Sequence, residues 1–254
     1  MRDRADMARR VLAAMDLTSL GEDDGPEVAR ALCAAARTRH GAPAAICVYP
    51  ELVATARESL AALGLAHVAV ASVANFPDGG SDADRAVREV RRALAAGADE
   101  VDVVFPYRAL MAGDSASGAT LLARCRELRG GRYGLKAILE TGVLADPALI
   151  ARASAIAIEA GADFIKTSTG KVAVNATPEA AATMLRAIRE HGGRCGFKAA
   201  GGIRTLDEAA VYLDLADAIL GPGWAGPQRF RIGASRLLAE IQSVLDPGSA
   251  PPPG

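Results

Sequence analysis

The sequence has few of the residues that bind metal ions or form disulfides. Its 254 residues include four cysteines and three histidines. Cys33, Cys47, Cys125 and Cys195 lie far apart, with no CxxC pair and no cysteine–histidine pairing, so we expect no metal site. Scattered cysteines in a chain with no export signal predict reduced thiols and a cytoplasmic location.

An excess of charge of one sign and long apolar runs are also lacking. Lys and Arg total 29 against 30 Asp and Glu, a formal net charge of −1, so neither nucleic acid nor a membrane surface is an expected partner. Apolar runs reach only the length of a strand, which argues against a membrane span. Residues 1–14 mix charged and apolar side chains as an amphipathic helix does, unlike a signal peptide.

What the sequence does contain is an alternation of short β-prone apolar runs with longer amphipathic stretches rich in Ala, Leu, Glu and Arg. This alternation predicts strands that are each followed by a helix. The predicted strands are Ala44–Tyr49, His67–Val73, Glu100–Val104, Gly134–Leu139, Asp163–Thr167, Gly196–Ala199, Ala218–Leu220 and Arg229–Ile232. The predicted helices are Glu51–Leu63, Asp82–Ala96, Gly118–Arg129, Pro147–Ala160, Pro178–Glu190, Leu206–Leu215 and Ala234–Leu245.

Helix-capping signals support several of these boundaries. Asp146 and Thr177 each precede a proline at the first helical position, where the missing N–H of proline costs nothing. Thr205 and Glu208 have the spacing of a capping box.

Eight strands separated by helices predict an α/β fold, the (β/α)₈ TIM barrel, which usually runs near 250 residues. A doubly wound open sheet is the alternative, but no glycine-rich fingerprint follows the first predicted strand. Residues 1–245 are expected to form one domain. Met1–Ala14 and Pro26–Arg39 are expected to be extra N-terminal helices that cap the bottom of the barrel. The proline-rich tail, residues 246–254, is expected to be disordered.

Charged residues interrupt four of the predicted strands. They are Asp102, Lys136, Lys166 and Lys198. One such residue alone is more simply a snorkelling lysine or an edge-strand charge. Lys and Asp are almost never fully buried without partners, however. Four of them on neighbouring strands therefore predict one shared polar site inside the barrel.

A pair of close lysines permits a particular chemistry. An amine attacks a carbonyl only when it is unprotonated, and a free lysine has a pKa of about 10.4. A second ammonium nearby, together with partial desolvation, lowers that pKa. Neutrality requires a drop of roughly three units. Formation of a Schiff base with a carbonyl compound is therefore the natural use of this pair.

Glycine-bearing turns follow the late predicted strands, where barrels commonly bind phosphate. The last of them precedes a predicted helix, whose N-terminal N–H groups attract anions. Each turn alone is weak evidence, but three on one face, with a lysine and a serine beside them, predict a phosphorylated small molecule as ligand. The turn residues are Gly170, Lys171, Gly201, Gly202, Gly233, Ala234 and Ser235.

In the segments that carry these lysines and glycine turns, and from about Met15 to Leu245 as a whole, the chain closely resembles the deoxyribose-phosphate aldolase family. The matching segments are Met15–Thr18, Ala44–Pro50, Gly97–Met111, Gly161–Lys171, Gly196–Lys198 with Gly201-Gly202, and Gly233–Ser235. The run that contains Lys166 is long and specific to the family.

The resemblance implies a class I aldolase that uses no metal or other cofactor and reversibly joins acetaldehyde to glyceraldehyde 3-phosphate. Lys166 would be the Schiff-base nucleophile, and Lys198 would be the cation that lowers its pKa. Asp102 would transfer protons with support from Asp16. Cys47 falls in a matching segment near the expected site and would contact the substrate, although an isolated cysteine is more often a small buried hydrophobe. The resemblance also suggests a homodimer, which no apolar stripe in the sequence requires.

The resemblance further implies that Gly170, Lys171 and the other turn residues hold the phosphate. The chain departs from the family pattern at Arg236, where many members have serine, and at Ala199, where many have proline. Arg236 could contact phosphate or point to solvent, and Lys136 receives no role. Two alternatives remain: a lysine-dependent aldolase for another sugar phosphate, and a non-catalytic sugar-phosphate binder.

Overall fold

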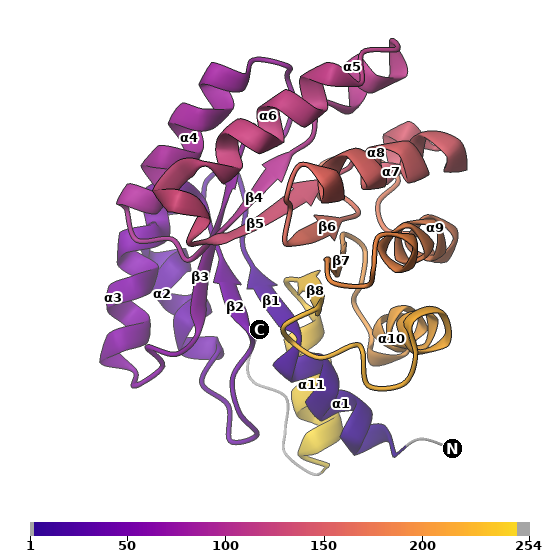
Figure 1. Cartoon of the computed structure of the whole chain (residues 1–254). Helices are drawn as coiled ribbons and strands as arrows, with labels where there is room; N and C mark the ends of the chain where they lie inside the picture. Colours follow the sequence, from indigo (N-terminus) through magenta and orange to yellow (C-terminus); the bar gives the residue numbers. More distant parts are fainter. Residues whose placement is uncertain (1–2, 248–254) are drawn as a thin grey trace.

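Eight short strands pair in parallel in the order β1 to β8, and β8 pairs with β1 to close a barrel. The computed structural model describes residues 3–247. The helices surround the strands, and α1 lies beside α11, so the two ends of the described chain meet (Figure 1). The predicted (β/α)₈ barrel is confirmed.

The strands are β1 Met15–Thr18, β2 Ala45–Cys47, β3 Ala69–Ala74, β4 Glu100–Val104, β5 Gly134–Ile138, β6 Phe164–Lys166, β7 Gly196–Ala200 and β8 Phe230–Ala234. The α-helices are α1 Arg4–Ala13, α2 Pro26–Ala35, α3 Val53–Ala62, α4 Ala83–Ala95, α5 Tyr107–Met111, α6 Ala116–Arg126, α7 Thr141–Leu144, α8 Pro147–Glu159, α9 Pro178–Glu190, α10 Leu206–Leu220 and α11 Leu237–Leu245. Two 3₁₀ turns, η1 Pro50–Leu52 and η2 Leu128–Gly131, complete the pattern.

The capping signals act as predicted. The Asp146 side chain accepts from the Ala148 N–H at the start of α8, and the Thr177 side chain accepts from the Ala180 N–H at the start of α9. Thr205 and Glu208 form a complete capping box on α10. These bonds satisfy N–H groups that have no partner within the helix.

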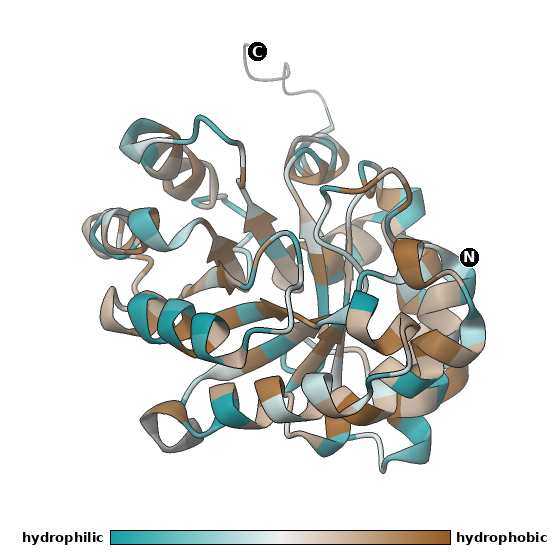
Figure 2. Ribbon diagram, turned by 90° about the horizontal axis from the view of Figure 1, so that it is seen from above, coloured by the Kyte–Doolittle hydropathy of each residue, from teal (hydrophilic) through white to brown (hydrophobic). Residues whose placement is uncertain are grey.

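The core lies on both sides of the strands. Apolar residues gather on the strands at the centre of the molecule, and polar residues appear on the surrounding helices (Figure 2). The packing of α6 depends on a close approach: a Cβ at Gly118 would lie 2.2 Å from the Phe105 ring. Glycine at this position lets α6 pack against the end of β4.

One strand was missed by the prediction, and one predicted strand is wrong. The first strand, Met15–Thr18, was not predicted, because it has only four residues, contains an aspartate and follows α1 directly. Ala218–Leu220 was predicted as a strand but forms the last turn of α10. The apolar triplet there continues a helix that began at Leu206, so the helical hydrogen bonds outweigh the local β preference.

Corrections at the two ends follow from the position of β1. Pro26–Ala35 comes after β1 and packs against α3, so it belongs to the outer ring of helices and does not cap the barrel. Helix α1 enters β1 directly, and it packs against α10 and α11. Gly233 and Ala234 are the last residues of β8, and α11 starts only at Leu237.

The predicted disordered tail lies outside the described residues from position 248 onward. Its first residue, Asp246, is described: a carboxylate oxygen lies 2.6 Å from His40 Nε2 and 2.8 Å from Arg39 Nε. No helix within residues 3–247 is both long enough and apolar enough to cross a bilayer.

Candidate active site

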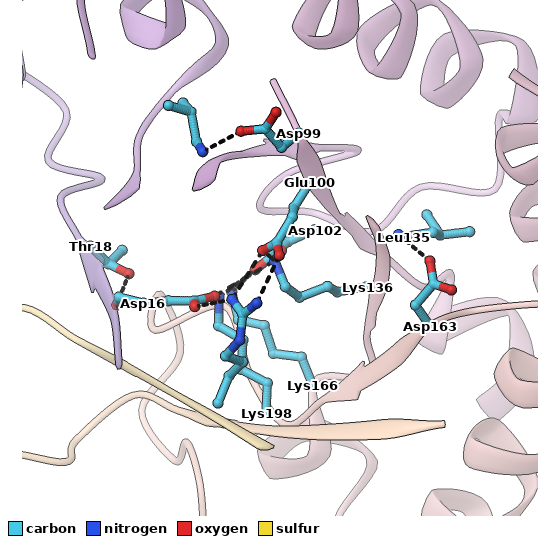
Figure 3. Close-up of polar contacts among 12 residues, drawn as sticks. Asp16, Thr18, Asp99, Glu100, Asp102, Leu135, Lys136, Asp163, Lys166 and Lys198 are labelled. Atoms are coloured by element: carbon cyan, nitrogen blue, oxygen red, sulfur yellow. Dashed lines mark hydrogen bonds and ion pairs between the residues drawn. The ribbon is translucent and has the colours of Figure 1, made fainter. Parts of the chain in front are cut away.

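Seven charged side chains from six strands converge inside the barrel, and we call them the ionic cluster. Figure 3 shows Asp16, Glu100, Asp102 and the three lysines pointing toward one centre. The members are Asp16 on β1, Glu100 and Asp102 on β4, Lys136 on β5, Lys166 on β6, Lys198 on β7 and Arg231 on β8. The barrel interior is thus polar where apolar layers are usual.

Strand register brings these residues together. Asp102 lies opposite Lys136 in the β4–β5 pair, and Lys198 lies opposite Lys166 in the β6–β7 pair and opposite Arg231 in the β7–β8 pair. Side chains of paired residues in neighbouring strands point to the same face of the sheet.

Asp102 is the hub of the ionic cluster. It is fully buried, and its Oδ1 accepts from Lys136 Nζ at 2.8 Å. Its Oδ2 accepts from Lys166 Nζ at 2.9 Å and from Lys198 Nζ at 2.8 Å. One carboxylate therefore touches all three lysines that the sequence singled out.

Asp16 and Glu100 complete the cluster. Asp16 Oδ2 accepts from Lys198 Nζ at 2.5 Å, and Asp16 Oδ1 accepts from Arg231 Nη1 at 2.7 Å. Glu100 lies 2.6 Å from Lys136 Nζ and accepts from Arg231 Nη2 at 2.9 Å. Asp16 thus links Lys198 to Arg231, an arginine that was not predicted as a site residue.

The electrostatics distinguish the three lysines. Burial and then the neighbouring Lys198 lower the pKa of Lys166, against the opposing attraction of Asp102. Burial also acts to lower the pKa of Lys198 and that of Lys136, but their carboxylate neighbours outweigh it and raise both. Burial acts to raise the pKa of Asp102, yet the lysines hold it well below its ordinary value. Lys166 is therefore the amine that is easiest to deprotonate.

A cavity of about 410 Å³ opens next to the ionic cluster, and Lys166 is the only member of that cluster among its lining residues. The lining includes every predicted turn residue: Gly170, Lys171, Gly201, Gly202, Gly233, Ala234 and Ser235, together with Arg236. Four further lining residues were not singled out from the sequence: Ser19, Leu20, Gly21 and Arg204.

The turn after β6 is held from below by Glu140. Its carboxylate accepts from the Thr169 hydroxyl at 2.5 Å and from the Thr169 N–H at 3.2 Å. Thr169 Oγ1 accepts in turn from the Lys171 N–H at 3.0 Å. These bonds fix the backbone that borders the cavity beside Lys166.

The turn after β7 requires glycine. Gly201 has φ +88°, and a Cβ there would lie 2.6 Å from Asn175 Cβ. A side chain would therefore be strained and would clash. Lys171 Nζ donates to the Leu20 carbonyl at 2.6 Å, which ties the β6 turn to the loop after β1.

Cys47 lies outside the cavity lining. It is fully buried on β2 and packs with Ala45, Ala71 and Val73. Burial raises the pKa of its thiol. The structure therefore gives Cys47 the place of a small core residue, and a contact with substrate remains a prediction. No group of three or more His, Cys, Asp or Glu side chains within residues 3–247 is arranged to hold a metal ion.

Comparisons with known proteins identify the family to which the chain belongs. The model of the DeoC/LacD family of aldolases matches residues 10–242. Two crystal structures from Toxoplasma gondii ME49, provisionally named deoxyribose-phosphate aldolase, are 26% and 28% identical to this chain, each with a TM-score of 0.89. Each match covers 97% of this chain, and the matches cover 97% and 98% of the two Toxoplasma chains. A Coccidioides immitis protein with the same provisional name is 28% identical with a TM-score of 0.78, covering 92% of this chain and 87% of its own. Because the family match takes in all eight strands, this chain belongs to the DeoC/LacD family of aldolases.

Proposed function

We propose that the protein reversibly cleaves 2-deoxy-D-ribose 5-phosphate to acetaldehyde and D-glyceraldehyde 3-phosphate through a Schiff base on Lys166. One observation carries this proposal. Of the three buried lysines, only Lys166 both lines the cavity and has a lowered pKa. A reactive amine therefore faces the space in which a small carbonyl compound would bind.

The first step is attack of the neutral Lys166 amine on C1 of the open-chain sugar. The carbinolamine that forms loses water to give an iminium ion, whose positive charge draws electrons from the C2–C3 bond. When the C3 hydroxyl loses its proton, that bond breaks, glyceraldehyde 3-phosphate leaves, and the enamine of acetaldehyde remains on Lys166.

Asp102 is the proposed centre of proton transfer. It contacts both Lys166 and Lys198, so its carboxylate and a water in the cavity can carry protons between the C3 hydroxyl, the enamine carbon and the amine. Asp16 supports this path by holding Lys198. Protonation of the enamine at C2 and hydrolysis of the iminium release acetaldehyde and regenerate Lys166.

The glycine turns provide the proposed phosphate site at the other end of the cavity. Backbone N–H groups in such turns bind anions without a side chain in the way, and Lys171, Arg204 and Arg236 add positive charge around the same space. Phosphate at C5 would be held there while C1 reaches Lys166.

Reductive trapping tests the proposal. Acetaldehyde with borohydride should leave an ethyl group on Lys166, found by peptide mass mapping, and 2-deoxyribose 5-phosphate should compete with it. Label on Lys136 or Lys198 would move the nucleophile to another lysine. An unlabelled protein that still binds the sugar phosphate would be the non-catalytic binder.

We expect Arg236→Ser to weaken discrimination in favour of the phosphorylated sugar. The ratio of kcat/KM for deoxyribose 5-phosphate to that for deoxyribose should fall about 3- to 10-fold, as expected for loss of one partly solvated charge contact. Arg189→Ser, an exposed arginine on α9 away from the cavity lining, is the control. An unchanged ratio in Arg236→Ser would mean that Arg236 points to solvent.

A further inference from the structure

The ionic cluster contains an unequal number of charges. Its four basic members are Lys136, Lys166, Lys198 and Arg231, and its three carboxylates are Asp16, Glu100 and Asp102. All seven are buried or nearly so. If every group were ionised, one positive charge would remain in a site that water barely reaches, which is costly.

Lys166 is the cation that the cluster holds least firmly. Its ion pair is with Asp102, which it shares with Lys136 and Lys198. Lys198 also contacts Asp16, and Lys136 also contacts Glu100 and lies 3.6 Å from Asp16. A proton leaving the cluster therefore comes from Lys166.

Arg231 supplies the excess charge through ion pairs with the carboxylates Asp16 and Glu100. Its guanidinium contacts Asp16 and Glu100, donates through Nε to the Pro227 carbonyl at 2.6 Å, and lies over the Phe164 ring at 5.5 Å. An arginine stays protonated in proteins, so this positive charge is permanent.

We propose, building on the Schiff-base function assigned to Lys166 above, that Arg231 and Glu100 are positioning residues that set the protonation state of Lys166 through the charge balance of the cluster. With Arg231 present, the fully ionised cluster has a net charge of +1. Loss of the Lys166 proton makes the cluster neutral. Glu100 opposes this effect, because its carboxylate offsets one cation.

The groups that face Lys166 from each packed element support this balance. The surrounding groups are Asp16 from β1, Cys47 from β2, Asp102 from β4, Lys136 from β5, Glu140 beyond the end of β5, and Lys198 from β7. Arg231 and Glu100 form the next layer, where Arg231 contacts both Asp16 and Glu100. Burial keeps the Cys47 thiol neutral by raising its pKa, and burial likewise raises the pKa of Glu140. The Cys47 thiol therefore adds no fixed charge, and the Glu140 carboxylate accepts from the Thr169 hydroxyl and N–H instead of pairing with a cation of the ionic cluster.

Removing Arg231 should leave the carboxylates ionised. Asp16 keeps Lys198, and Glu100 keeps Lys136. Three carboxylates then face three lysines, so the fully protonated cluster is neutral and Lys166 keeps its proton to higher pH. Glu100→Gln has the opposite effect, because four cations face two carboxylates.

The experiment measures the rate of borohydride trapping by acetaldehyde against pH for the whole protein. In Arg231→Gln the pH of half-maximal trapping should rise by about one unit, and in Glu100→Gln it should fall by about one unit, since a unit charge nearby has this effect at the effective dielectric of a protein interior. Arg231→Lys keeps the charge and should restore the wild-type midpoint. Circular dichroism and thermal unfolding establish that each variant is folded.

Opposite shifts with rescue by lysine support the proposal, because a purely structural defect lowers the amplitude of trapping without moving the midpoint in opposite directions. Midpoints that stay fixed, or that move the same way in Glu100→Gln and Arg231→Gln, overturn it. If Arg231→Gln does not fold, the comparison of Glu100→Gln and Arg231→Lys with wild type still decides. Absence of label on Lys166 in the wild-type protein would instead refute the proposed function.

Discussion

Replacing Lys166 by methionine is expected to abolish cleavage of deoxyribose 5-phosphate, with a loss in kcat on the order of 10⁴-fold or more, because no other group can form the covalent intermediate. Lys136 and Lys198 have raised pKa values and lie outside the cavity lining, so neither can replace it. The measurement is steady-state cleavage coupled to detection of glyceraldehyde 3-phosphate, together with the loss of borohydride trapping.

Stability provides the control for this variant. If Lys166 is neutral in the wild-type protein, as proposed above, methionine of similar size leaves three cations and three carboxylates in the cluster, so the thermal midpoint should change little. Lys136→Met removes a fully buried ammonium that contacts Asp102 and Glu100, which should cost about 3–5 kcal/mol. Residual cleavage by Lys166→Met within a hundredfold of wild type would assign the nucleophile elsewhere.

The second large effect is expected from Lys198→Met. Loss of this ammonium removes repulsion from Lys166 and frees Asp102 to attract the Lys166 proton, so both changes raise the pKa of Lys166. Each unit of increase lowers the neutral fraction tenfold. We expect kcat/KM at pH 7 to fall about 10²- to 10³-fold, from this effect and from the interrupted proton path.

The pH dependence separates the two causes. A group with a raised pKa becomes deprotonated as the pH rises, so the deficit of Lys198→Met should narrow between pH 7 and pH 9.5. Lys198→Arg keeps the positive charge and should lose less at pH 7. A deficit in Lys198→Met that is the same at every pH would mean that Lys198 acts on proton transfer alone.

The sequence predicts the barrel well because the relevant signals are local. Capping residues such as Thr205 and the alternation of apolar runs with amphipathic stretches depend on near neighbours in the chain. The end of α10 was misread for the opposite reason: Ala218–Leu220 has β-prone residues, but its conformation is decided by the helix that precedes it. Strand β1 has only four residues, which is too few for an alternation of apolar and polar side chains to indicate a strand.

The candidate site could be predicted in part. Asp102, Lys136, Lys166 and Lys198 stand out as charges within predicted strands, whereas Asp16 required the family resemblance. Arg231 could have been predicted as a site residue in the same way, because it is a charged residue within the predicted strand Arg229–Ile232.

The contacts among these residues could not be predicted, because they depend on strand register and on closure of the barrel. The β4–β5 register places Lys136 opposite Asp102, which also contacts the other two lysines. The sequence alone assigned no role to Lys136 and could not identify these partners. Closure decides that Asp16, at the start of the chain, meets Arg231 near its end.

This closure has a consequence for synthesis on the ribosome. Asp16 contacts Lys198 and Arg231 across 182 and 215 residues of sequence, and β1 obtains its second neighbour only when β8 is present. During translation the charges of the earlier strands therefore lack part of their partners until almost the whole chain has emerged. The surroundings proposed to lower the pKa of Lys166 are therefore complete only after the last strand has been made, so an incomplete nascent chain lacks the full ionic cluster.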